Sequence, residues 1–166
     1  MSGANSKCAV CLGAEGDKEL DRTLVWEDSY WRLTTSLGGE VVGFSYLEPK
    51  RHIPHITDLD GEEARTLGPV LAKVTRALKE STGAELVYIY VFGGGIPHLH
   101  IHLGPHREGD PLNHQMIRGE VAEKKLPSGA TAFVSSDFPQ LPDSFHRDAR
   151  ERIRRAMASG PSEKPD

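Results

Sequence analysis

The chain has 166 residues, a formal net charge of −4 and 37% hydrophobic residues, which suffices for one domain with its own core. The negative charge excludes the overall basic field that binds nucleic-acid polymers, although a single phosphate group could still bind locally. The sequence has no apolar run of membrane-spanning length, and residues 1–7 lack the apolar stretch of a secretion signal. We therefore expect a cytoplasmic protein without a membrane partner.

The amino-terminal part of the chain predicts a flexible lead followed by three strands. Residues 1–7 form the lead. Aromatic and β-branched residues over 23–35 predict a hairpin that turns near 27–29. A second run of this kind, over 41–47, predicts a strand that ends at Pro49.

One long amphipathic helix comes next. Apolar residues recur at steps of three and four between Leu59 and Leu78, which is the helical period. Thr57 or Asp58 is the predicted N-cap and Gly83 the predicted C-terminal stop. We expect the apolar stripe of this helix to pack into the core rather than to bind a partner.

The next segment predicts two strands joined by glycines. Residues 86–92 are continuously apolar and aromatic, residues 93–95 are all glycine, and residues 97–103 alternate histidine with apolar residues. The short link predicts that these two strands are antiparallel neighbours. Together with the preceding elements they indicate an α+β fold with a largely antiparallel sheet.

The carboxy-terminal third is less regular. Residues 105–131 are rich in Gly, Pro and charge and predict a long loop or an insert. Residues 145–157 predict a helix whose basic face is solvated. Residues 159–166 predict a disordered tail.

The most informative feature is a row of three alternating histidines, His98, His100 and His102. In a strand this spacing puts all three imidazoles on one face and the intervening apolar residues on the other. An imidazole can act as a nucleophile, a general acid or a metal ligand near neutral pH. The preceding glycines, Gly94 and Gly95 among them, could bring backbone N–H groups close to an anion.

These histidines allow two kinds of chemistry. They could chelate one metal ion together, or one of them could attack phosphorus as a nucleophile. Cys8 and Cys11 add a C-x-x-C pair, which in a reducing compartment is more often a metal site than a disulfide. A thioredoxin-like site would need a strand before the pair and a helix after it, so we favour metal binding.

Two thiolates and two imidazoles make a closed, tetrahedral zinc site of the structural type. Cys8, Cys11, His52 and His98 would complete such a site. Filled in this way, the site has no open position for a substrate water. It would leave His100 and His102 for chemistry.

Three features of the chain occur together in one known family. The run from His98 to Gly104 resembles the signature of the histidine triad (HIT) family of nucleotide hydrolases and transferases. Cys8-x-x-Cys11 and Pro-Lys-x-His at 49–52 resemble the zinc-containing bacterial branch of that family. The resemblance covers residues 8–105. It implies a HIT-like catalytic core over 1–105. Residues 106–158 lie outside the match, and we expect them to form an extension packed on or near the site.

The resemblance also implies roles for individual residues. His100 would attack the α-phosphorus of a nucleotide ester, anhydride or amidate and form a nucleotidyl-histidine intermediate. His102 would hold the phosphate, with Gly94 and Gly95 contributing N–H groups. His106 is either a further phosphate contact or a surface residue. The family further implies a structural zinc ion, a nucleotide substrate that is most often a purine, and a homodimer with a continuous sheet.

Several residues keep other functions open. The polar residues that many family members carry before the triad are replaced here by Tyr90-Val91-Phe92 and Ile96-Pro97. A nucleotide-binding or scaffolding protein with weak catalysis is therefore the alternative. A metallohydrolase with its metal on all three histidines is a third hypothesis. Trp26 and Trp31 could hold the base, although tryptophans at such positions are more often part of the core.

Overall fold

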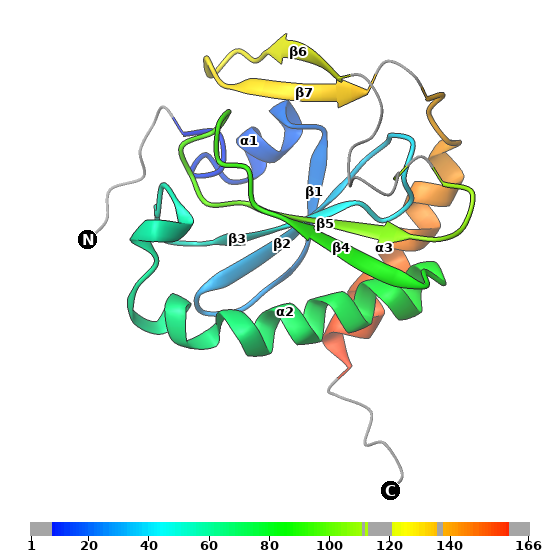
Figure 1. Ribbon diagram of the computed structural model, residues 1–166, viewed down its shortest axis with the longest axis horizontal. Helices are drawn as coiled ribbons and strands as arrows, with labels where there is room; N and C mark the ends of the chain where they lie inside the picture. Colours follow the sequence, from blue (N-terminus) through cyan, green and yellow to red (C-terminus); the bar gives the residue numbers. More distant parts are fainter. Residues whose placement is uncertain (1–7, 111, 113–120, 136–137, 160–166) are drawn as a thin grey trace, which may run out of the picture.

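The computed structural model describes residues 8–110, 112, 121–135 and 138–159. It has an α+β fold built on a five-stranded antiparallel sheet in the order β1-β2-β3-β5-β4, with a separate hairpin of β6 and β7 (Figure 1). The elements are α1 (Ala14–Glu19), β1 (Arg22–Glu27), β2 (Trp31–Ser36), β3 (Ser45–Pro49), the 3-10 turn η1 (Ile56–Asp58), α2 (Gly61–Thr82), β4 (Leu86–Tyr90), β5 (Ile101–His106), β6 (Val121–Lys125), β7 (Thr131–Ser135) and α3 (Asp143–Ala158).

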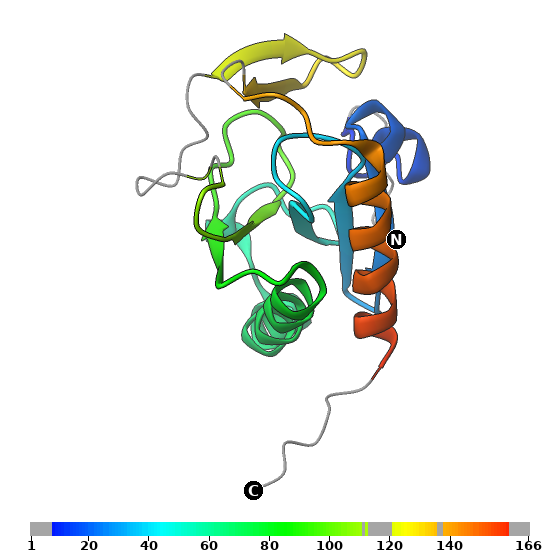
Figure 2. The same cartoon turned by 90° about the vertical axis from the view of Figure 1, so that its right-hand side faces the viewer.

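One face of the sheet forms the core with the two long helices. Leu33, Leu47 and Leu103 are fully buried and pack with Val74 and Leu78 of α2. Figure 2 shows α2 end-on and α3 alongside it, and Ile153 and Met157 bring α3 into the same core. Within the described residues, no helix combines the length and apolar character needed to cross a bilayer.

The opposite face of the sheet is unusually polar. Strand alternation places Arg32, Tyr46, Glu48 and His102 on the side away from Leu33 and Leu47. We call this side the triad face. Phe44 and Val41, in the segment before β3, cover part of it together with Leu112.

The boundaries of several predicted elements are shifted: β4 ends at Tyr90 rather than at 92, and β5 spans Ile101–His106 rather than 97–103. β3 begins at Ser45 rather than at 41, because Gly43 has a φ of 75°, which an extended strand does not have. Glycine fits this position, since a Cβ there would lie 2.5 Å from a Thr82 methyl. α2 begins at Gly61 after Asp60, because residues 56–58 form the separate turn η1. The hairpin of β1 and β2 and the left-handed C-cap at Gly83 are confirmed.

For residues 105–131, where the sequence predicted a long loop or an insert, the described residues contain strands and so favour the insert. β5 continues to His106, and β6 pairs with β7 in a hairpin that turns at 126–130. The Ser128 backbone N–H donates to Glu19 Oε1 at 2.9 Å, which ties this hairpin to α1. The predicted helix over 145–157 is confirmed as α3, whereas the expected lead at 1–7 and nearly all of the expected tail lie outside the described residues.

Candidate functional site

Two cysteines and two histidines meet at one end of the sheet. The ligand atoms of Cys8, Cys11, His52 and His98 all lie within 4.8 Å of one another. His98 Nδ1 is 3.4 Å from each of the two sulfur atoms, and His52 Nδ1 is 3.3 Å from Cys11 Sγ. A tetrahedral zinc ion would set sulfur–nitrogen separations of about 3.5 Å. The four residues therefore fit a closed structural zinc site, as the sequence predicted.

Local structure brings these four ligands together from distant parts of the chain. The C-x-x-C segment is a tight turn in which the Leu12 N–H donates to the Cys8 carbonyl at 3.2 Å. The turn is held by packing of Cys8 and Val10 on Ile96. His52 follows the end of β3, and His98 precedes the start of β5.

His98 begins the alternating run, in which Leu99, Ile101 and Leu103 all lie in the core as predicted. It lies in a bend before β5 rather than in the strand, and its ring is turned to the cysteines. Its Nε2–H donates to the Pro49 carbonyl at 2.8 Å, which leaves the Nδ1 lone pair facing the sulfur atoms. Burial lowers the pKa of His98 to about 4, so the imidazole is neutral and able to bind a metal.

His100 is oriented by the backbone of His98. Its Nδ1–H donates to the His98 carbonyl oxygen at 2.6 Å. Because a carbonyl only accepts hydrogen bonds, the proton is on Nδ1 and the Nε2 lone pair is free to react. Burial lowers the pKa of His100. The side chain is therefore a neutral, oriented imidazole at neutral pH.

His102 sits beside His100 among aromatic rings. The two imidazole centroids are 5.0 Å apart, and the rings of Tyr46 and Phe92 lie 5.2 Å and 5.3 Å from His102. Tyr46 approaches from β3 and Phe92 follows β4, so the ring of His102 lies between its two neighbouring strands. The structure thus brings together His100 and His102, the two residues predicted to act on the phosphate.

A buried charge network borders the same site, and the sequence did not predict it. Glu48 is fully buried and accepts from Arg22 at 2.5 Å, while Arg32 lies 3.6 Å from its other oxygen. Arg32 also pairs with Asp17 of α1. The Arg22 guanidinium lies 3.6 Å from the centre of the Tyr46 ring. Polar residues at alternate strand positions are the only sequence signal for this network.

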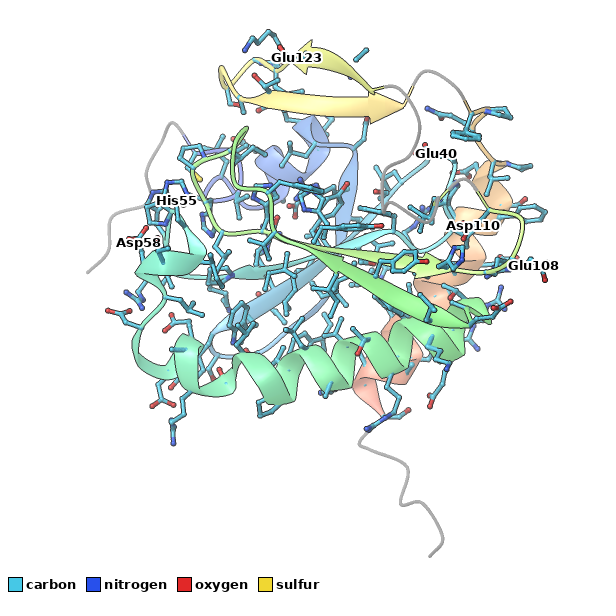
Figure 3. The ribbon with its side chains drawn as sticks, viewed as in Figure 1. Glu40, His55, Asp58, Glu108, Asp110 and Glu123 are labelled. Atoms are coloured by element: carbon cyan, nitrogen blue, oxygen red, sulfur yellow. The ribbon has the colours of Figure 1, made fainter. Side chains whose placement is uncertain are left out.

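The predicted phosphate contacts lie at opposite ends of β5. Gly94 and Gly95 belong to the link between β4 and β5, where Gly93 passes close to His55. His106 is four residues beyond His102, a distance of about 13 Å along a strand. Its Nδ1 lies 2.8 Å from Asp110 Oδ1, and in Figure 3 Asp110 and His55 are at opposite sides of the molecule. The structure thus separates His106 from the glycines.

The two tryptophans lie away from the triad face. Trp31 is fully buried in the core, where its indole N–H donates to Thr66 of α2 at 2.9 Å. Trp26 packs against that core and carries Lys73 over its ring. The hypothesis that they hold the base is not supported by these positions.

The site contains an oriented imidazole with a second imidazole beside it. Two cysteines and two histidines form a separate cluster. This arrangement is that of a histidine-triad site. The model of the HIT domain family matches residues 17–109. The chain belongs to the HIT family.

Similar proteins agree with this assignment. The nitrilase and fragile histidine triad fusion protein NitFhit of Caenorhabditis elegans is 31% identical over an alignment of 90 residues, and the match covers 51% of this chain and 20% of that protein. The chain thus matches about a fifth of that relative's length.

Two solved structures share the fold. A zinc-bound histidine triad family protein from Mycobacterium smegmatis has a TM-score of 0.62 and 21% identity, and the match covers 94% of this chain and 96% of the other. The histidine triad protein blr8122 from Bradyrhizobium japonicum has a TM-score of 0.66 and 20% identity, with coverage of 84% and 93%.

Proposed function

We propose that this protein is a nucleotide hydrolase or nucleotidyl transferase that reacts through His100. The observation that carries the proposal is the hydrogen bond from His100 Nδ1–H to the His98 carbonyl. It directs the lone pair of Nε2 away from the backbone and fixes the tautomer that a nucleophile needs. The lowered pKa of His100 keeps that nitrogen unprotonated.

The reaction takes two steps on one nitrogen. His100 Nε2 attacks the α-phosphorus, the bond from phosphorus to the leaving group breaks, and the leaving group departs with the electron pair and takes up a proton. Water then attacks the nucleotidyl-histidine and regenerates the imidazole, or an acceptor hydroxyl or phosphate does so in a transferase. His102 and the N–H groups of Gly94 and Gly95 would stabilise the charge on the phosphoryl oxygens.

The cluster of two cysteines and two histidines would support the position of His100. A zinc ion held by Cys8, Cys11, His52 and His98 would anchor the amino-terminal turn to the sheet. His98 would then be both a metal ligand and the source of the carbonyl that orients His100. Because His98 is turned to the cysteines, the geometry favours a structural metal over one shared by all three histidines.

The first prediction concerns the nucleophile. We expect His100→Ala to lose at least about 1,000-fold in kcat/KM on an adenosine phosphoramidate and on a dinucleoside polyphosphate, because the variant lacks the oriented imidazole that would form the covalent intermediate. Unaltered thermal unfolding would show that the variant is folded. Acid quenching during turnover followed by mass spectrometry should detect a nucleotidyl adduct on His100.

The same experiment distinguishes the proposed enzyme from the alternative function. A nucleotide-binding protein with weak catalysis is favoured by Ile96 and Pro97, since Ile96 is buried and Pro97 has no N–H to offer a phosphate. That protein would bind nucleotide without an adduct and would show the same residual turnover with and without His100.

The second prediction concerns the metal. We expect the double variant Cys8→Ser, Cys11→Ser to contain no zinc by atomic absorption and to unfold at a lower temperature, because a structural zinc site contributes directly to folding. Ser6→Ala provides a control that keeps both thiols. Zinc retained in full by the double variant would contradict this ligand set and would restore the metallohydrolase hypothesis.

A further inference from the structure

Among the residues that the structure describes, Phe92 is the most exposed large hydrophobic side chain, at 70%. It follows the edge strand β4 and leads into the glycine link. Its ring contacts His102 edge-on, with centroids 5.3 Å apart at 71°. An exposed phenyl ring is thus held against a residue of the proposed reaction.

One face of this ring is already occupied. Phe92 stacks on Tyr90 with a centroid separation of 5.6 Å and an angle of only 15°. Near-parallel stacking covers one face of the phenyl ring and leaves the other to solvent, where a further planar ring could continue the stack. Tyr90 pairs directly with His102 across β4 and β5, so the stack starts inside the sheet and ends beside the triad.

The other flank of the histidine pair is closed. On the β3 side Tyr46 contacts His102 and carries Arg22 over its ring, and Arg22 is bound to the buried Glu48. On the β4 side Phe92 and Gly94 are both exposed. A substrate can therefore extend from the histidines toward Phe92.

We propose that Phe92 is a stacking platform for a planar aromatic ring of the substrate, joined to the phosphoryl group that reacts at His100. This inference rests on the proposed function. The ring has two possible sources with the same chemistry, the base of the nucleotide or an aromatic leaving group. Stacking of this kind tolerates different rings, because each presents a π-face.

The test compares substrates that differ only in their rings. Phe92→Ala is assayed on adenosine phosphoramidates with an aryl or an alkyl amine, and on the ribose 5-phosphoramidates of the same two amines. We expect kcat/KM to fall about 5- to 150-fold wherever the stacked ring is present. If Phe92→Ala still loses kcat/KM on the adenosine compound with an alkyl amine, the ring that stacks on Phe92 is the base. If it still loses kcat/KM on the ribose compound with an aryl amine, the stacked ring is that of the leaving group.

Control variants separate stacking from other roles. Phe92→Trp should restore activity, because it keeps a planar ring. Val91→Ala removes an exposed apolar side chain from the same segment without removing a ring, and should leave kcat/KM unchanged. An equal loss by Phe92→Ala on the substrate with no ring, or no loss on any substrate, would overturn the inference. So would a change in oligomeric state, measured by sedimentation, because Phe92 would then contact a second copy of the chain.

Failure of the proposed function has a different signature, namely no turnover of any of these compounds by the unaltered protein. The platform is then judged by calorimetry with adenosine monophosphate and phenyl phosphate. Weaker binding of at least one of them by Phe92→Ala supports it, and unchanged binding of both overturns it.

Discussion

The buried carboxylate of Glu48 is expected to make a large contribution to the free energy of unfolding. It is fully buried between Arg22 and Arg32, which come from the two strands on one side of it. Removing one partner of a buried ionic group leaves the remaining charges in a poorly solvated site, at a cost of about 3–5 kcal/mol. We expect Glu48→Gln to lower the free energy of unfolding by that amount, measured by urea denaturation.

An exposed ion pair between β1 and the residue that follows β3 is the control. Lys50 and Glu27 are 3.2 Å apart, with 42% and 49% of their side chains exposed. Such pairs contribute less than about 1 kcal/mol, so Glu27→Gln should change the free energy of unfolding little. Losses of similar size in both variants would show that the buried network is no more important than a surface pair.

At the scale of elements, Arg51 joins the segment after β3 to the first turn of α2. Its guanidinium binds both carboxylate oxygens of Glu63, at 3.1 Å and 3.2 Å. This interaction lowers the pKa of Glu63 from its ordinary 4.5. A carboxylate with a depressed pKa stabilises the fold above its unfolded pKa, and this contribution disappears as the pH falls through the folded value.

Glu63→Gln should therefore lower the melting temperature at pH 7. The difference from the unaltered protein should shrink as the pH falls below about 4.5, where the unfolded carboxyl takes up a proton, and should disappear below the lowered folded pKa of Glu63, where the residue is protonated in both states. Glu62→Gln is the matched control, since Glu62 is adjacent and pairs with Arg65, whose side chain is 73% exposed. A difference that stays constant from pH 7 to pH 3 would contradict an electrostatic role for Glu63.

The elements predicted best were those whose signal is local. The apolar period of α2 and the glycine at its end depend on residues a few positions apart. The cluster of Cys8, Cys11, His52 and His98 is not local, and it was anticipated from what a metal requires of thiolates and imidazoles. The hairpin of β6 and β7 was missed because β6 carries Glu123, Lys124 and Lys125 and shows no apolar alternation. The network around Glu48 was missed because Arg22 and Glu48 are 26 positions apart and meet only through the register of the sheet.

At the scale of the whole molecule, the two edges of the sheet differ. The β1 edge is covered by α3, which packs on β1 and whose Arg154 donates to the Leu24 carbonyl at 3.3 Å. Figure 2 shows α3 (orange) beside the blue strand at this edge. β4 is the last strand at the other edge, with Leu86 and Ile89 exposed at 42% and 44%. An open edge with apolar side chains is suited to pairing with another strand.

We therefore propose that two copies of the chain join through β4 into one continuous sheet. Ile89→Lys should convert the dimer to a monomer at micromolar concentration, because a lysine cannot be buried unpaired in that contact. Leu24→Lys places the same charge on the β1 edge, at a residue 36% exposed, and should leave the dimer intact. Sedimentation velocity distinguishes the two states. A dimer broken by Leu24→Lys and not by Ile89→Lys would move the interface to the β1 edge and leave β4 to the substrate alone.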